Sequence, residues 1–199
     1  MNHRTHIEAL GHLLTWYAED LAFFNTFRQY AHGEIDLDAY KKSTASFQKF
    51  VNKYRVARNF EAGETALVLD ICMDWYRTGQ WKDTDVDDLA NRLMNRGNLT
   101  REKLTVSLAS KAMFLMRPDL VLPYDIRARK TLGYRKNNYA GFFEKALAFE
   151  KQHILLLDGI LDRASDWLDE LERPFVGQID KLPIIRRRRL LDKLLWVGV

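Results

Sequence analysis

The chain has 199 residues, of which 47% are hydrophobic and 29% charged, with 10 Gly, 4 Pro, one Cys and a formal net charge of +4. This length suits one globular domain, and so few Gly and Pro argue against the many turns of a β-sandwich or barrel. A single Cys excludes an internal disulfide framework and a zinc ribbon built from Cys pairs. There is no apolar run of about 20 residues, and residues 1–6 lack the order of a signal peptide. We therefore expect an all-α protein of the cytoplasm.

Apolar side chains recur at helical spacing along most of the chain and predict about eight helices. The expected helices cover residues 7–30, 36–58, 61–77, 85–96, 100–116, 124–133, 138–172 and 184–196. Thr100 is the expected N-cap of the fifth helix, because its hydroxyl can accept a backbone hydrogen bond. Residues 138–172 are interpreted as one long helix or two. We expect one helical domain over residues 1–199, with a two-lobed arrangement as the alternative.

Charge divides the domain into two halves. Residues 1–99 form an acidic half with 12 Lys and Arg against 14 Asp and Glu, whereas residues 100–199 form a basic half with 19 against 13. Residues 101–136 alone carry nine basic and three acidic side chains, and residues 186–189 are four consecutive arginines. Clustered positive charge is typical of proteins that bind phosphate backbones. A solvated helix face is the alternative interpretation of such a cluster.

The segment 105–133 carries the candidate chemistry. Lys111 lies near the middle of an expected helix, and an apolar loop leads to Pro123 and Asp125. Pro123 favours an extended conformation in the residue before it and blocks helix continuation, so a new helix is expected to begin just after it. Asp125 then lies at a helix N-terminus, where backbone N–H groups stabilise its ionised form. Such a carboxylate can stabilise a developing cation and orient a water; the alternative is that it serves only as an N-cap.

Residues 110–125 run Ser-Lys, apolar helix, Pro-Asp, loop and Pro-Tyr-Asp, and a basic helix follows. This order resembles the catalytic segment of the helix-hairpin-helix superfamily of DNA glycosylases, in particular its divergent 8-oxoguanine-glycosylase-like members. The resemblance implies that Asp125 stabilises the oxocarbenium-like sugar, that Lys111 occupies the position of the lysine that attacks the sugar in bifunctional members, and that Tyr124 contacts substrate. The glycine hairpin of the superfamily is replaced here by residues 105–110, and 14 residues separate Lys111 from Asp125.

Other side chains fit the same chemistry. A base that is cleaved from DNA must first leave the stack and be held by aromatic or apolar walls. Trp75, Tyr76 and Trp81 are candidates for such walls, the alternative being ordinary core or surface aromatics. Side chains near Asp125 are expected to contact the DNA backbone on either side of the lesion. These residues are Ser110, Arg127, Arg129, Lys130, Arg135 and Lys136.

These observations predict a DNA glycosylase that removes a damaged or modified base, in DNA repair or in defence against phage with modified DNA. A non-catalytic helical DNA-binding module, in which Asp125 only caps a helix, is the first alternative. A helical protein-interaction domain is the second. The expected partner is double-stranded DNA, bound by a monomer associated with the nucleoid, with no membrane contact. No metal and no cofactor are expected, because the sequence has neither paired metal ligands nor a nucleotide-binding loop.

Overall fold

The computed structural model describes residues 3–79, 82 and 85–198. These residues form α-helices and two 3₁₀ segments without any strand, so the all-α class is confirmed. The elements are α1 (His3–Ala31), α2 (Leu37–Lys42), α3 (Phe47–Lys53), η1 (Ala57–Asn59), α4 (Thr65–Arg77), α5 (Asp85–Met94), α6 (Val106–Met116), α7 (Ile126–Thr131), α8 (Tyr139–Gln152), α9 (Ile154–Arg163), α10 (Ser165–Glu172), η2 (Arg173–Phe175) and α11 (Leu182–Val197). None of the helices within these ranges is both long and apolar enough to cross a membrane.

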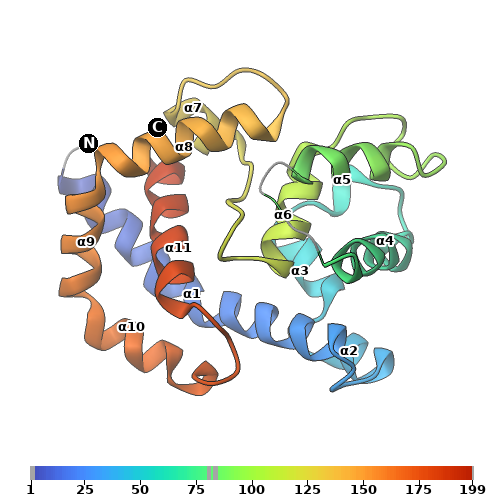
Figure 1. Cartoon of the computed structure of the whole chain (residues 1–199), viewed down its shortest axis with the longest axis horizontal. Helices are drawn as coiled ribbons and strands as arrows, with labels where there is room; N and C mark the ends of the chain where they lie inside the picture. Colours follow the sequence, from blue (N-terminus) through green and yellow to red (C-terminus); the bar gives the residue numbers. More distant parts are fainter. Residues whose placement is uncertain (1–2, 80–81, 83–84, 199) are drawn as a thin grey trace.

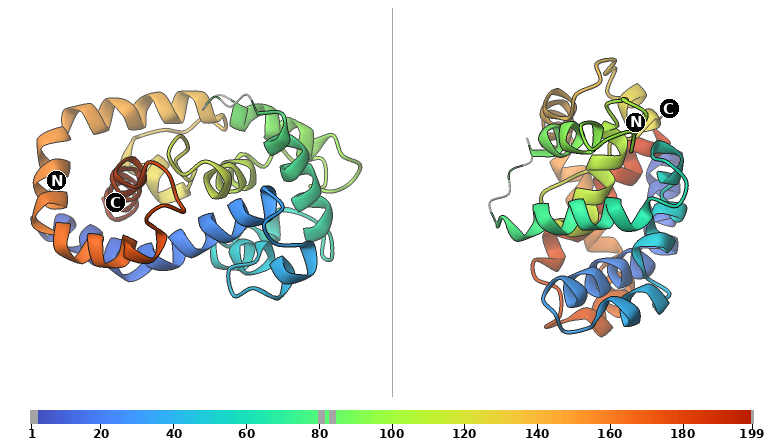
Figure 2. Two further views of the ribbon diagram at one scale, coloured as in Figure 1. Left: turned by 60° about the horizontal axis from the view of Figure 1, so that its bottom comes forward. Right: turned by 90° about the vertical axis from the view of Figure 1, so that its right-hand side faces the viewer.

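Helix α1 runs along the molecule and joins two groups of helices (Figure 1). Helices α2–α6 lie beside its C-terminal part, and α7–α11 lie beside its N-terminal part. The most extensive helix pairing is between α1 and α11, followed by α5 with α6 and α7 with α11. In the left view of Figure 2, α6 and α11 lie inside an outline drawn by α1, α4, α5 and α8–α10. The first and last helices of the chain therefore pack together, with α11 inside this outline and α1 along its side.

Helix α6 has the composition that its inner position requires. Every residue of α6 other than Ser107 is buried, including Lys111. A helix that is apolar on all sides is stable only when other elements surround it. Buried apolar side chains from α1 to α11 form one connected cluster. The apolar core therefore crosses the boundary between the acidic and basic halves of the sequence.

The arginines of α11 are held by acidic residues of the surrounding helices. Arg186 pairs with Asp169 and Glu172, Arg187 with Asp158, Arg188 with Glu150, and Arg189 with Asp20 and Asp192. Their partners lie on α1 and α8–α10, apart from Asp192 on α11 itself. The run was expected to be a DNA contact or an exposed helix face. Instead, all four arginines pair with carboxylates and join α11 to its neighbours; Arg189 is buried, and the other three are half-buried.

The deepest of these pairs joins α1 to α11. The side chains of Arg189 and Asp20 are 1% and 0% exposed. Tyr54 donates a hydrogen bond of 2.7 Å to Asp20 Oδ1, and Arg189 Nη1 donates one of 2.8 Å to Asp192. Burial by itself raises the pKa of Asp20, but the charges of Arg189 and Lys53 outweigh it and the pKa falls below its usual value. Asp20 is therefore held as a carboxylate in the interior.

Two expected helices are divided in the structure. Residues 36–58 form α2, α3 and η1, because Ser43 and Ser46 adopt extended backbone conformations and Arg55 is left-handed with φ 55°. Residues 138–172 form three helices, divided at His153 and Ala164. Neither division carries Gly or Pro. The bends let α8, α9 and α10 each present acidic residues to α11. Because this contact is tertiary, the local sequence at each bend does not predict it.

The fifth helix begins later than expected. Thr100 is not its N-cap, because its hydroxyl donates a 2.8 Å hydrogen bond to the carbonyl oxygen of Lys103. Arg101 and Glu102 both have left-handed backbones, with φ of 55° and 57°. The helix therefore starts only at Val106, with Thr105 before it.

We predict that Asp20→Asn lowers the free energy of unfolding by about 3–5 kcal/mol, because it leaves the buried Arg189 without its main counter-charge. Urea denaturation followed by circular dichroism measures the change. The matched control is Asp158→Asn, which removes the partner of Arg187 at a site where Asp158 is 41% exposed and should cost about 1 kcal/mol or less. Equal losses in the two variants would contradict the central role of the Asp20–Arg189 pair.

Candidate functional site

The structure brings Lys111 and Asp125 together. Lys111 Nζ lies 3.8 Å from Asp125 Oδ2, with the two side chains 10% and 26% exposed. Lys111 projects from the buried helix α6, and Asp125 lies at the start of α7. The result is a partly accessible carboxylate beside an almost buried amine. The two candidate catalytic residues are therefore neighbours.

A hydrogen bond one residue earlier sets this register. Tyr124 N donates to Ser110 Oγ over 3.0 Å, so Ser110–Tyr124 and Lys111–Asp125 are consecutive contacts with the same separation of 14 residues. The loop is also held by Tyr139, whose hydroxyl accepts from Leu122 N at 2.8 Å. These bonds place the chain after Pro123 directly against α6.

Asp125 is the N-cap of α7, as the sequence predicts. Its backbone is extended, with φ −119° and ψ 152°, and its side chain accepts a hydrogen bond from the backbone N of Arg127 over 2.8 Å. This cap occupies Oδ1, whereas Oδ2 faces Lys111. The cap holds the carboxylate in a defined direction without covering it.

The environment of Lys111 disfavours its charge. Burial lowers the pKa of Lys111, and this effect exceeds the opposing influence of the carboxylates of Asp125 and Asp192. Arg58 also lowers the pKa of Lys111. Lys111 Nζ donates a hydrogen bond to the carbonyl oxygen of Tyr54 at 3.1 Å. A buried amine with a lowered pKa is more easily obtained in its uncharged, nucleophilic form.

The cations that follow Asp125 lack acidic partners. The group consists of Arg127, Arg129, Lys130, Arg135 and Lys136, and none of them forms an ion pair with any residue that the structure describes. Arg127 lies over the ring of Trp196 at 4.1 Å, and Arg129 lies over the ring of Tyr124 at 4.8 Å. Lys130, Arg135 and Lys136 are exposed. The positive charge near Asp125 is therefore available at the surface.

Two candidate contact residues lie in the interior. Ser110 is 0% exposed, and its hydroxyl is engaged between Tyr124 N and the carbonyl oxygen of Ser107, so its expected phosphate contact is not available in this conformation. Tyr124 is 3% exposed and donates a 2.7 Å hydrogen bond to the carbonyl oxygen of Lys136. Residues 106–110 belong to buried α6, so this segment forms no exposed phosphate-binding hairpin.

The upstream aromatic candidates lie on a different part of the fold. Trp75 is buried in α4 beneath Arg92 of α5, whose guanidinium is 4.4 Å from the ring centre. Tyr76 packs edge-on against Phe27 of α1 with ring centres 5.5 Å apart. Helix α4 packs on α3, α5 and α6, whereas α7 packs on α11. Trp81 lies outside the described residues.

Sequence reasoning missed an aromatic group that contacts Arg127, two residues after Asp125. Trp196 of α11 contacts Arg127, and His12 of α1 meets the Trp196 ring edge-on at 5.0 Å. Trp16 follows His12 by four residues on α1, which places both on one helix face. The spacing of His12 and Trp16 was readable in the sequence, but their nearness to Trp196 comes from the pairing of α1 with α11.

Lys193 is a second partly buried amine, and it lies on the side of α11 that carries Trp196. It is 16% exposed, and its Nζ lies 3.8 Å from Asp192 Oδ2. Burial and the charge of Arg189 lower the pKa of Lys193 to about 8, against the opposing influence of Asp192. Lys193 and Trp196 are three residues apart, so both face the neighbourhood of Arg127 and α1.

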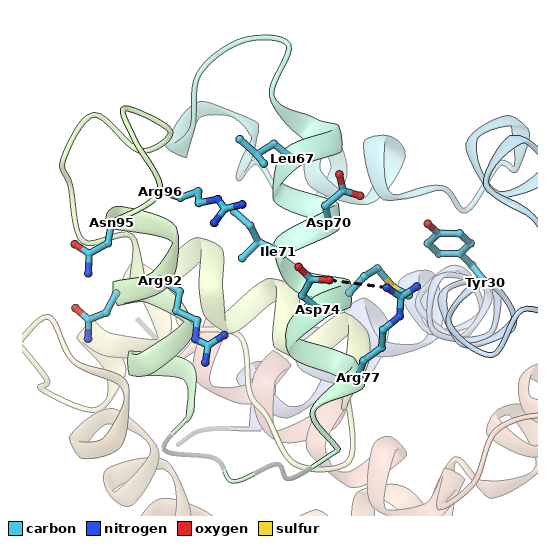
Figure 3. Close-up of a pocket in the computed structure, with 11 residues that line it drawn as sticks. Tyr30, Leu67, Asp70, Ile71, Asp74, Arg77, Arg92, Asn95 and Arg96 are labelled. Atoms are coloured by element: carbon cyan, nitrogen blue, oxygen red, sulfur yellow. Dashed lines mark ion pairs between the residues drawn. The ribbon is translucent and has the colours of Figure 1, made fainter.

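Two grooves lie away from Asp125. The larger, of about 790 Å³, runs between α4 and α5 and is bordered by acidic Asp70 and Asp74 and by Arg92 and Arg96 (Figure 3). Asp74 pairs with Arg77 at 3.8 Å within it. The smaller, of about 360 Å³, lies where the arginines of α11 meet α8–α10. Neither groove is lined by Lys111 or Asp125. The candidate site is therefore assigned from the Lys111–Asp125 pair and not from the volume of a groove.

Within residues 3–79, 82 and 85–198, no cluster of three or more His, Cys, Asp or Glu side chains is arranged to hold a metal ion. No family model, curated protein or solved structure matches this chain. The candidate site therefore rests on the geometry of Asp125, Lys111 and the cations beside them.

We predict that Lys193 makes the protein more stable as pH rises between about 8 and 10.5. In this range the folded protein binds fewer protons than the unfolded chain, so the free energy of unfolding increases with pH. From pH of about 7.5 to about 9.5 the gain is about 1–2 kcal/mol. Urea denaturation at both pH values should show a larger gain in the wild type than in Lys193→Met, in which only the smaller contribution of Lys111 remains. The exposed Lys151→Met serves as control, and a gain unchanged in Lys193→Met would refute the assignment.

Proposed function

We propose that the protein is a DNA glycosylase that hydrolyses the N-glycosidic bond of a damaged or modified base. The observation that carries this proposal is the pairing of Asp125 with Lys111 beside surface cations that have no acidic partner among the described residues. A phosphate backbone bound to those cations would lie next to the Asp125 carboxylate, which is partly accessible. The proposed role is base excision, in DNA repair or in defence against modified phage DNA.

The reaction requires a negative charge near the sugar. As the bond between C1′ and the base nitrogen breaks, the base leaves with the bonding electrons and positive charge develops on the sugar ring. The carboxylate of Asp125 stabilises that charge by electrostatics. Water then bonds to C1′ and releases a proton, which balances the charge of the departing base. The N-cap bond from Arg127 N holds Asp125 in place during these steps.

Lys111 adds a second chemical possibility at the same site. An uncharged amine can attack C1′, displace the base and form an imine with the opened sugar, which is the chemistry of bifunctional glycosylases. Burial lowers the pKa of Lys111, which favours the uncharged amine. Its hydrogen bond to the carbonyl of Tyr54 holds it next to Asp125. Attack requires Lys111 to turn from Tyr54 toward the substrate.

A non-catalytic DNA-binding module is the competing proposal. Residues 106–110 are a buried helix in place of a phosphate-binding hairpin, and this observation favours binding by surface cations alone. In that case Asp125 only caps α7. The two proposals differ in whether a base is released, so a single assay separates them.

We predict that Asp125→Asn lowers the rate of base release by at least about 100-fold, because it removes the charge that stabilises the sugar cation. Asn is as good an N-cap as Asp, so α7 should remain intact. The assay measures free base and abasic sites from duplexes carrying a panel of damaged and glycosylated bases. Asp36→Asn, which alters the exposed N-cap of α2, is the matched control. Release that is undiminished in Asp125→Asn would overturn the catalytic assignment.

If Lys111 and not water attacks C1′, we predict that borohydride traps a covalent adduct between the wild-type protein and substrate DNA, because the imine that Lys111 forms is reducible. Lys111→Met should form no adduct. Gel electrophoresis of the reduced mixture measures the covalent complex. The exposed Lys151→Met is the control and should be trapped as the wild type is. Base release without any adduct in the wild type would mean that water, not Lys111, is the nucleophile.

A further inference from the structure

An aromatic and cationic surface lies beside the Lys111–Asp125 pair. We define the α1–α11 face as Trp16, His12, Trp196, Arg127 and Lys53. Arg127 lies over Trp196 at 4.1 Å, and His12 meets Trp196 at 5.0 Å. Lys53 Nζ lies 4.9 Å from the centre of the Trp16 ring. These contacts connect α1, α3, α7 and α11 into one continuous surface.

This face continues directly into the candidate site. Arg127 is two residues after Asp125, and its backbone N caps the Asp125 carboxylate. At the other end, Lys53 is followed by Tyr54, whose carbonyl oxygen holds Lys111. Both ends of the α1–α11 face therefore touch the residues that position the catalytic pair.

The aromatic members of the face remain accessible. Trp16 is 41% exposed, although it is among the largest apolar side chains of α1. Trp196 is half-buried and carries Arg127 against its ring. Arg127 is exposed and has no acidic partner within the part of the chain that the structure describes, whereas Lys53 pairs with Glu19 at 2.6 Å. The face thus offers the exposed Trp16 side chain and, on Trp196, a guanidinium without an acidic partner among the described residues.

We propose that the α1–α11 face binds unpaired nucleotides of a DNA strand, with bases against Trp16 and Trp196 and a phosphate on Arg127, which must turn away from the Trp196 ring to admit a base. Rings next to cations bind single strands, because every base has a face that can stack on an aromatic side chain. In a paired duplex the bases stack on one another and are closed to such rings. The protein therefore binds unpaired bases in preference to a fully paired duplex. This inference takes its location from the proposed function, but it concerns binding and not bond cleavage.

The experiment measures affinity for DNA without any modified base. A fluorescein-labelled single strand of mixed sequence is titrated with the full-length wild-type protein, and fluorescence anisotropy reports binding. The same strand is then tested in a full duplex and in a duplex with a short central bubble. We expect the single strand and the bubble to bind at least about fivefold more tightly than the duplex, and Trp16→Ala to weaken single-strand binding about 5- to 100-fold.

Matched variants keep the result interpretable. Trp167→Ala removes a ring of α10 that is 61% exposed and should leave affinity unchanged. Trp196→Ala should weaken binding like Trp16→Ala, with circular dichroism confirming its fold. Arg127→Gln should reduce the dependence of log affinity on log salt concentration by about one unit. Equal affinity for duplex and single strand, or unchanged affinity in Trp16→Ala, would overturn the inference.

The two proposals fail in different ways. If the protein binds single strands through Trp16 but releases no base from any substrate, the proposed glycosylase activity fails and the binding inference stands. If it releases base while Trp16→Ala binds single strands as the wild type does, the binding inference fails and the glycosylase proposal stands.

Discussion

The buried pair of Asp20 and Arg189 is the interaction on which the rest of the structure depends. It joins the first and last helices at 0% and 1% exposure, where an unpaired charge would be strongly destabilising. Tyr54 bonds to the same carboxylate through its hydroxyl and to Lys111 through its carbonyl. One ion pair thus connects α1 and α11 to α3, and through α3 to α6. Two hydrogen bonds, both made by Tyr54, therefore connect this ion pair to Lys111 of the candidate site.

This connection explains why a short sequence segment becomes a site. The loop before α7 is fastened to α6 by the bond between Tyr124 N and Ser110 Oγ, and the next residue on each side supplies Asp125 and Lys111. Ser110, expected at the DNA surface, instead sets the register of the pair from inside. A buried polar group must find a partner, and here that requirement aligns two residues that the chain separates by 14 positions.

The distribution of charge has a similar explanation. The basic half of the sequence contains two clusters of cations, of which one is paired with carboxylates and the other is not. The arginines at 186–189 pair with acidic residues of α1 and α8–α11, and one of them, Arg189, is buried in the core. The cations of residues 127–136 find no such partners in the described structure and remain at the surface, with Arg127 stacked on Trp196. A count of charges along the chain therefore overstates the surface available to a phosphate backbone.

The sequence by itself determined the all-α class, the start of α7 after Pro123 and the capping role of Asp125, because helix periodicity, proline sterics and N-capping act over a few neighbouring residues. Only the tertiary structure decided the divisions at His153 and Ala164, the internal pairing of the arginines and the burial of Trp75. It also decided that Trp196 lies against His12, a residue far away from it in the sequence. These outcomes depend on which helices pack together, and helix packing joins residues whose separation leaves no local pattern.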